Sequence, residues 1–278
     1  MRGSVPMEGP TVVLLHSSGS SARQWRDLVA TLQPRFRVRA VDFHGHGVRS
    51  DWGGRSPMSL ADDAALVVPL LEEARGAHLI GHSYGGAVAL KLAALHPQWV
   101  RSVVAYEPVT FRLLFDDAAS RHPAQEVAAV ADWIRDRLLE GEALSAARRF
   151  VEFWSGAEAW RYLTPGRQNA IAARMRSVLR NFEALFHEAS GMKGLGMPLS
   201  IMTGARTVNA TRRIGELLRA ALPDADHEVL PEMGHMGPIT HAAVVNRRIA
   251  QFLRANEPDR RRFDPFSVLR LAPIATNH

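Results

Sequence analysis

The segment GHSYGG, residues 81–86, has the residue types and spacing of a nucleophilic serine held on a sharp turn. It follows the apolar run AHLIGHS and precedes apolar residues at helical spacing, so the turn would join a strand to a helix. Such a turn exposes the serine hydroxyl, and its glycines leave room where side chains would collide with the strand and the helix. The amino end of the helix also favours negative charge at the site. Ser83 is therefore predicted to be a nucleophile.

The elements that must position this serine alternate along the chain. Short apolar runs typical of strands are separated by segments with helical periodicity. The strand-like runs cover residues 11–16, 36–43, 77–83, 100–108, 198–204 and 226–232. This alternation predicts an α/β fold, with a mostly parallel sheet and helices on both of its faces.

A long helical segment interrupts this alternation. Between residues 111 and 197 the strand pattern disappears and apolar residues recur at helical spacing. We therefore expect a core formed by residues 1–110 and 198–255, with a helical cap inserted at 111–197. Residues 256–278 are rich in Pro and Arg and are predicted to be an extension that folding does not need. Met7 is a possible natural start, in which case residues 1–6 are not native.

The composition excludes several classes of function. With 278 residues and 46% hydrophobic content, the chain can bury a core without cross-links. It has no cysteine, which excludes disulfides, thiolate metal sites and cysteine nucleophiles. Its net charge of +6 comes from scattered arginines and not from a basic stripe, so we expect no nucleic-acid partner. No apolar run is long enough to span a membrane and no signal peptide is visible, so a cytoplasmic protein is expected.

The chain from about Thr11 to Leu253 resembles a capped serine hydrolase of the α/β-hydrolase fold superfamily. Besides GHSYGG, it shares a histidine and a small-residue loop after an early strand, LLHSSGSS, although Ser17 stands where the family usually has glycine. The resemblance implies that the backbone N–H groups of Ser18 and Tyr84 form an oxyanion hole. Ser17, one residue earlier, is the alternative donor.

A third shared feature is the loop DFHGHG, residues 42–47, which resembles the D-x-x-G-H-G loop of the family. In the family this loop is architectural. His44 and His46 lie only two residues apart and no carboxylate cluster accompanies them, so we expect no metal site and no cofactor.

The resemblance also implies a general base. In this fold the triad residues follow the chain order serine, acid, histidine. The family places its histidine in a Gly-His turn after the last strand, which corresponds to His235. His241 is the alternative, but it stands where the next helix begins and is predicted to cap that helix or to face solvent.

The triad acid departs from the usual pattern of the family. Most relatives have a carboxylate where Thr207 stands here, and a neutral side chain cannot stabilise an imidazolium ion. Some hydrolases of this fold carry their acid after the strand that follows the nucleophile helix, and there Glu107 lies 24 residues beyond Ser83. Glu107 is therefore predicted to be the acid, the alternatives being that it only pairs with an arginine, that the site has no acid, or that another carboxylate is the acid. Asp224 and Asp226 lie too far along the chain.

These residues predict a hydrolase that cleaves a carboxylic ester or a lactone through an acyl-enzyme. Serine at the turn argues against the dehalogenases and epoxide hydrolases of this fold, which use aspartate there. The aromatic residues of the cap favour a small to medium apolar group on a small-molecule substrate. Two alternatives remain open: a carbon–carbon bond hydrolase of the capped type, and a non-catalytic receptor for a small ligand.

Overall fold

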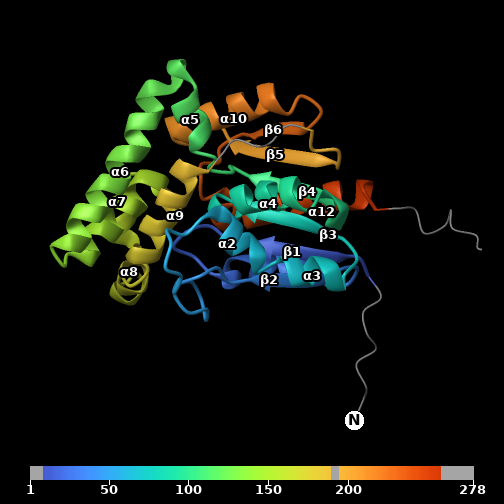
Figure 1. Ribbon diagram of the computed structural model, residues 1–278, viewed down its shortest axis with the longest axis horizontal. Coiled ribbons are helices and arrows are strands. Elements are labelled where there is room, and N and C mark those ends of the chain that lie inside the picture. Colours follow the sequence, from blue (N-terminus) through green and yellow to red (C-terminus); the bar gives the residue numbers. More distant parts are fainter. Residues whose placement is uncertain (1–8, 189–193, 258–278) are drawn as a thin grey trace, which may run out of the picture.

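The computed structural model describes residues 9–188 and 194–257. Its strands form one parallel sheet in the order β2-β1-β3-β4-β5-β6 (Figure 1). The strands are β1 (Thr11–Leu15), β2 (Arg37–Val41), β3 (Ala77–His82), β4 (Val100–Tyr106), β5 (Leu199–Gly204) and β6 (Asp226–Leu230). The predicted α/β fold with a parallel sheet is thus confirmed.

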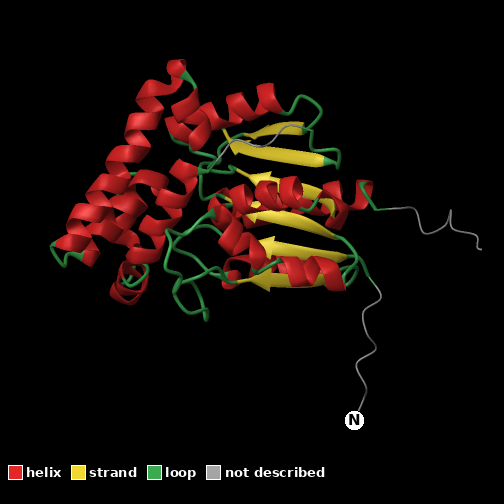
Figure 2. Cartoon of the chain, in the orientation of Figure 1, coloured by secondary structure: helices red, strands yellow, loops and turns green. Residues whose placement is uncertain are grey.

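Helices connect the strands and cover both faces of the sheet (Figure 2). The helices outside the cap are α1 (Arg26–Leu32), α2 (Leu60–Ala65), α3 (Val68–Glu73), α4 (Tyr84–Leu95), α10 (Asn209–Ala221), α11 (Gly237–Thr240) and α12 (Ala242–Ala255). Short 3₁₀ turns lie at Ala22–Trp25, Pro97–Trp99, Ala118–Ser120 and Ala159–Tyr162. The inner strands β1, β3, β4 and β5 are thereby largely removed from water on both sides, whereas the edge strands β2 and β6 stay partly exposed.

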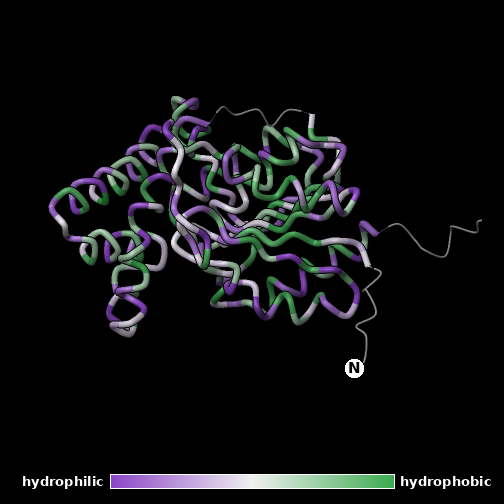
Figure 3. Tube along the Cα trace, turned by 60° about the horizontal axis from the view of Figure 1, so that its bottom comes forward, coloured by the Kyte–Doolittle hydropathy of each residue, from purple (hydrophilic) through white to green (hydrophobic). Residues whose placement is uncertain are grey.

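The two faces of the sheet have separate apolar cores, because successive side chains of a strand point in opposite directions. In β1, Val12 and Leu14 pack with residues of α1 and α12, whereas Val13 and Leu15 pack with residues of α2, α3 and α4. All four of these side chains are fully buried. Continuous apolar runs in the sequence are therefore strands buried on both faces, which Figure 3 shows as green segments through the centre of the molecule.

The helical insertion lies between β4 and β5. It comprises α5 (Arg112–Asp116), α6 (Arg121–Leu139), α7 (Ala143–Ser155), α8 (Pro165–Ala172) and α9 (Met175–His187). These helices gather at the end of the sheet where the strands have their carboxyl ends (Figures 1 and 2). Ligands of open α/β sheets bind at this end. The cap helices thus lie over the place where the candidate catalytic residues emerge.

Parts of two predicted segments lie outside the described residues. They are the possible non-native start, residues 1–6, and residues 258–278 of the predicted C-terminal extension. Within the described part of the chain, no helix is both long and apolar enough to cross a membrane.

Candidate active site

Ser83 occupies the sharp turn between β3 and α4. Its backbone has φ 57° and ψ −119°, a conformation that costs a non-glycine residue about 1–3 kcal/mol. The turn is tight enough to require glycine on both sides. A Cβ atom on Gly81 would lie 2.3 Å from the Gly85 carbonyl oxygen, and one on Gly85 would lie 2.3 Å from the Leu15 carbonyl oxygen. The two glycines therefore permit the strained turn that presents the Ser83 hydroxyl.

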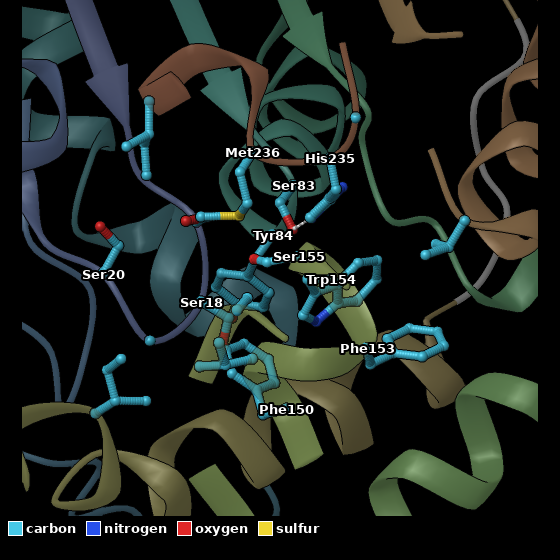
Figure 4. A pocket seen from close by; sticks show the side chains of 18 of the residues that line it. Ser18, Ser20, Ser83, Tyr84, Phe150, Phe153, Trp154, Ser155, His235 and Met236 are labelled. Carbon is cyan, nitrogen blue, oxygen red and sulfur yellow. Dashed lines mark hydrogen bonds between the residues drawn. The ribbon is translucent and has the colours of Figure 1, made fainter. Parts of the chain in front are cut away.

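His235 lies next to this hydroxyl, in the turn between β6 and α11. Its Nε2 atom is 2.9 Å from Ser83 Oγ (Figure 4). Its Nδ1 atom is 2.7 Å from Glu107 Oε2. A carboxylate only accepts hydrogen bonds, so Nδ1 carries the proton and Nε2 is left to accept the Ser83 hydroxyl. All three side chains are at least 95% buried. The structure thus brings together the serine, the histidine and the acid that were predicted from the sequence.

Glu107 directly follows β4 and is held by three hydrogen bonds. Oε1 accepts from the Gly204 N–H at 2.7 Å, and Oε2 accepts both from His235 and from the Thr207 hydroxyl at 2.7 Å. Its φ angle of 43° is in the left-handed region, which is strained for a non-glycine residue and persists only where the surrounding contacts hold the residue in place. No arginine forms an ion pair with Glu107 among the described residues, so the alternative that Glu107 only pairs with an arginine does not fit. Thr207, at the usual position of the acid, contacts the carboxylate.

The loop after β1 has one backbone donor engaged and one available. The Ser17 N–H donates to Gln24 Oε1 at 3.1 Å, and the Ser18 hydroxyl donates to Asn181 Oδ1 of α9 at 2.6 Å. Within the described ranges, the N–H groups of Ser18 and Tyr84 have no acceptor in the protein. This arrangement favours Ser18 over Ser17 as the partner of Tyr84 in an oxyanion hole.

A buried chain of hydrogen bonds links this loop to the turn that carries His235. Gln24 accepts from Ser17 and donates from Nε2 to His82 Nδ1 at 3.0 Å, and His82 Nε2 donates to the His235 carbonyl oxygen at 2.8 Å. Burial, and then the positive charge of a protonated His235, hold the pKa of His82 well below its usual value. His82 is therefore neutral and can donate from one nitrogen while accepting at the other.

The DFHGHG loop holds the oxyanion loop from its other side. His46 Nε2 accepts from the Gly19 N–H at 3.0 Å, and Asp42 accepts from the Ala22 N–H at 2.7 Å. Burial is the main cause that lowers the pKa of His46, which favours the neutral, accepting form. His44 instead contacts Asp63 at 2.8 Å. Both histidines thus have structural partners.

A cavity of about 850 Å³ opens at Ser83 and extends beneath the cap. Its wall is largely apolar and includes the aromatic rings of Phe111, Phe150, Phe153, Trp154 and Phe182. Figure 4 shows several of these rings close to Ser83 and His235. The alternative histidine, His241, lies exposed at the start of α12, and its ring contacts the Thr240 hydroxyl. His241 is thus not part of this site.

Trp154 of α7 lies directly against the imidazole of His235. The two ring centroids are 4.0 Å apart and the planes differ by 27°, which is a stacked arrangement. The indole is 92% buried, so it removes one face of the imidazole from water. A Trp ring also attracts a cation placed over its face. This contact would favour the imidazolium ion that forms when the histidine takes a proton.

Sequence reasoning did not find the residues that support the site. It missed Gln24 and His82, which link the two loops, Asn181, which holds Ser18 from the cap, and the stacking of Trp154 on His235. His82 stands within the GHSYGG segment, so its position was a signal that the sequence contained. The partners of Gln24 and Asn181 are 58 and 163 residues away along the chain, and no local pattern reports such contacts.

Comparison with known proteins identifies the family of this chain. The family model described as the alpha/beta hydrolase family matches residues 12–248, which include all three residues of the Ser83–His235–Glu107 arrangement. The chain therefore belongs to the α/β-hydrolase family, and it is a hydrolase by this membership.

Curated relatives carry more than one name. The chain is 27% identical over 262 residues to a pimeloyl-[acyl-carrier protein] methyl ester esterase of Methylococcus capsulatus, covering 89% of this chain and 96% of that protein. It is 30% identical over 258 residues to the dihydrolipoyllysine-residue acetyltransferase component of the acetoin cleaving system of Pseudomonas putida, covering 88% of this chain. That alignment spans 64% of the P. putida protein. A further alignment, with a pimeloyl-[acyl-carrier protein] methyl ester esterase of Aeromonas hydrophila, spans 37% of the A. hydrophila protein. The chain thus spans less than two thirds of several relatives that it matches.

Solved structures share the fold. The enol-lactonase of Burkholderia xenovorans LB400 superimposes with a TM-score of 0.69 at 21% identity, covering 91% of this chain and 94% of that one. At this identity the likeness shows the fold alone.

Proposed function

We propose that this protein is a serine hydrolase that cleaves a carboxylic ester or a lactone of a small molecule through an acyl-enzyme. The observation that carries the proposal is the hydrogen-bonded series Ser83 Oγ, His235 Nε2, His235 Nδ1 and Glu107 Oε2, with distances of 2.9 and 2.7 Å. These distances lie within reach of proton transfer between the serine and the imidazole. The names of the esterase relatives point in the same direction.

The chemistry follows from which nitrogen carries a proton. His235 Nε2 takes the proton of Ser83 as the hydroxyl oxygen attacks the substrate carbonyl carbon. The negative charge on the carbonyl oxygen is stabilised by the N–H groups of Ser18 and Tyr84, each worth about 3–4 kcal/mol in a comparable site. His235 then returns the proton to the leaving alkoxide. In the second half, water takes the place of the serine and releases the acid.

Glu107 and Trp154 act on the charged histidine in this scheme. The carboxylate stabilises the imidazolium through the Nδ1–H bond and holds the ring in the tautomer that leaves Nε2 free. Trp154 covers the ring and excludes water from it. The aromatic cavity takes the apolar part of the substrate, because burial of apolar surface stabilises the complex.

A panel of aryl esters with increasing acyl length, together with a lactone and a vinylogous diketone, tests the proposal. We expect hydrolysis of the esters or the lactone by the wild-type protein, and covalent labelling by a fluorophosphonate with the added mass on Ser83. Ser83→Ala should retain less than about one thousandth of the wild-type rate, allowing for residual catalysis by the oxyanion hole. Ser56→Ala, at an exposed serine, is the matched control.

The same panel separates the alternatives. Turnover of the diketone but not of the esters would assign the protein to carbon–carbon bond hydrolases. Tight binding of a ligand without turnover of any compound would assign it to receptors of this fold. Either result would contradict ester hydrolysis as the function.

A further inference from the structure

Two arginines of the cap line the otherwise largely apolar cavity. They are Arg174, the residue immediately before α9, and Arg167 of α8. Arg174 is half-buried, whereas Arg167 is exposed. Within the described residues, the side chain of Arg174 makes one hydrogen bond, which is long: its guanidinium donates to the Gly19 carbonyl oxygen at 3.4 Å. Gly19 adjoins Ser18, so this positive charge lies beside the candidate oxyanion loop.

These two arginines differ from most others in the cap, which pair with a carboxylate. The paired arginines are Arg112, Arg135, Arg137, Arg148, Arg161 and Arg180. In residues 9–188 and 194–257, no Asp or Glu oxygen lies within 4.0 Å of Arg174 or Arg167. Arg121, Arg149 and Arg176 also lack an acid, but they are exposed and do not line the cavity. Water can solvate those three fully.

A half-buried guanidinium loses part of its hydration and is expected to have a partner. The acidic side chain that lines the cavity, Glu232, already pairs with Arg206. Burial, and to a lesser extent the charge of Arg174, lowers the pKa of His46, so this neighbour of Arg174 is a neutral imidazole and not an anion. No described group of the protein therefore supplies the anion for Arg174.

We propose that Arg174, assisted by Arg167, binds a carboxylate that belongs to the substrate and is separate from the bond being cleaved. The substrate would then be a monoanionic ester or lactone, such as a half-ester of a dicarboxylic acid. This proposal rests on ester hydrolysis at Ser83. A guanidinium is suited to this role, because its planar donors match the two oxygens of a carboxylate. The net charge of +6 attracts such a substrate at long range.

Matched pairs of methyl esters, followed by release of methanol, test this subsite. Monomethyl succinate, adipate and suberate are compared with methyl butanoate, hexanoate and octanoate, so that each pair differs only by a terminal carboxylate in place of a methyl group. A second arm compares the acetate ester of a six-carbon hydroxy acid with hexyl acetate. It places the charge on the alcohol side of the ester bond. The measured quantity is the ratio of kcat/KM for the anionic ester to that for its neutral partner.

The ratio within each variant cancels any loss of active protein. For at least one pair, we expect the wild-type ratio to exceed one by about 10- to 100-fold, the range for a hydrogen bond to a charged group. Arg174→Gln should lower this ratio by at least about tenfold, and Arg174→Lys by less. Arg176→Gln, two residues away on the exposed side of α9, is the matched control and should leave the ratio unchanged.

Two results would overturn the subsite while leaving ester hydrolysis intact. One is a wild-type ratio of one or less for every pair in both arms. The other is an equal fall in the ratio for Arg174→Gln and Arg176→Gln, which would reflect general electrostatic attraction. If none of these esters is hydrolysed although the aryl esters or the lactone of the first panel are, the subsite is also overturned. If neither the esters nor the lactone is hydrolysed, the proposed function itself is wrong and the subsite fails with it.

Discussion

Glu107→Gln replaces one carboxylate oxygen with an amide nitrogen while the shape of the side chain is kept. In the wild-type protein, Oε1 accepts from the Gly204 N–H and Oε2 accepts from His235 Nδ1, both at 2.7 Å. An amide has only one acceptor oxygen. If this oxygen remains at Gly204, the amide NH₂ faces Nδ1, which must then give up its proton. The proton moves to Nε2, and that nitrogen can no longer accept the proton of Ser83.

The opposite orientation of the amide fails for another reason. Its NH₂ group would then face the Gly204 N–H, and a buried donor left without an acceptor costs about 1–3 kcal/mol. In either orientation the imidazolium loses its negative partner. The corresponding acid-to-amide change in a Ser-His-Asp protease lowers kcat about 10⁴-fold. We expect a fall of about 10³- to 10⁴-fold here, or about 4–5.5 kcal/mol in the activation free energy.

Initial rates on an aryl ester between pH 6 and 9 measure this effect, with KM expected to change little. Glu72→Gln makes the same chemical change at an exposed position and is the control. Thr207→Val removes one of the three hydrogen bonds to the carboxylate, so kcat should fall by only about 2- to 10-fold. Retention of more than a tenth of wild-type kcat by Glu107→Gln would refute the assignment of the acid. A fall in kcat that is larger for Thr207→Val than for Glu107→Gln would refute it as well.

Gln24→Leu removes the link between the oxyanion loop and His82, so kcat should fall about tenfold with a smaller change in KM. An unchanged kcat would show that the loop does not need this link. Gln33→Leu, at an exposed position, is its control. A separate prediction concerns His78 of β3, whose pKa is lowered to about 4, mainly by burial and also by Arg101. Below pH 6.5 the unfolded chain binds a proton at this residue while the folded protein does not, so stability is lost as the pH falls from 6.5 towards 4. His78→Leu should flatten the dependence of the free energy of unfolding on pH by up to about 1.36 kcal/mol per pH unit, and denaturant titrations that give parallel curves for both proteins would contradict this reasoning.

The sequence by itself determined the features that depend on local pattern. The apolar runs predicted the inner strands β1, β3, β4 and β5 because these are buried on both faces, and the helical periodicity after residue 111 predicted the cap helices. The turn at Ser83 could be predicted because its glycines and its serine are adjacent in the chain. The chain order of the fold then pointed to His235, and the neutral Thr207 pointed to Glu107 as the acid.

Only the tertiary structure decided which distant groups meet. Glu107 and His235 are 128 residues apart, and they come within 2.7 Å because their strands end at the same edge of a parallel sheet. The sequence excluded Thr207 as the acid but did not show its contact: it donates a hydrogen bond to the acid because β5 lies between β4 and β6. The spacing of the cap aromatics could not tell which rings face the cavity, because amphipathic helices bury rings against each other and against a substrate in the same way. The stacking of Trp154 on His235 and the unpaired charge of Arg174 follow from how the cap packs on the sheet, and long-range packing leaves no local pattern in the sequence.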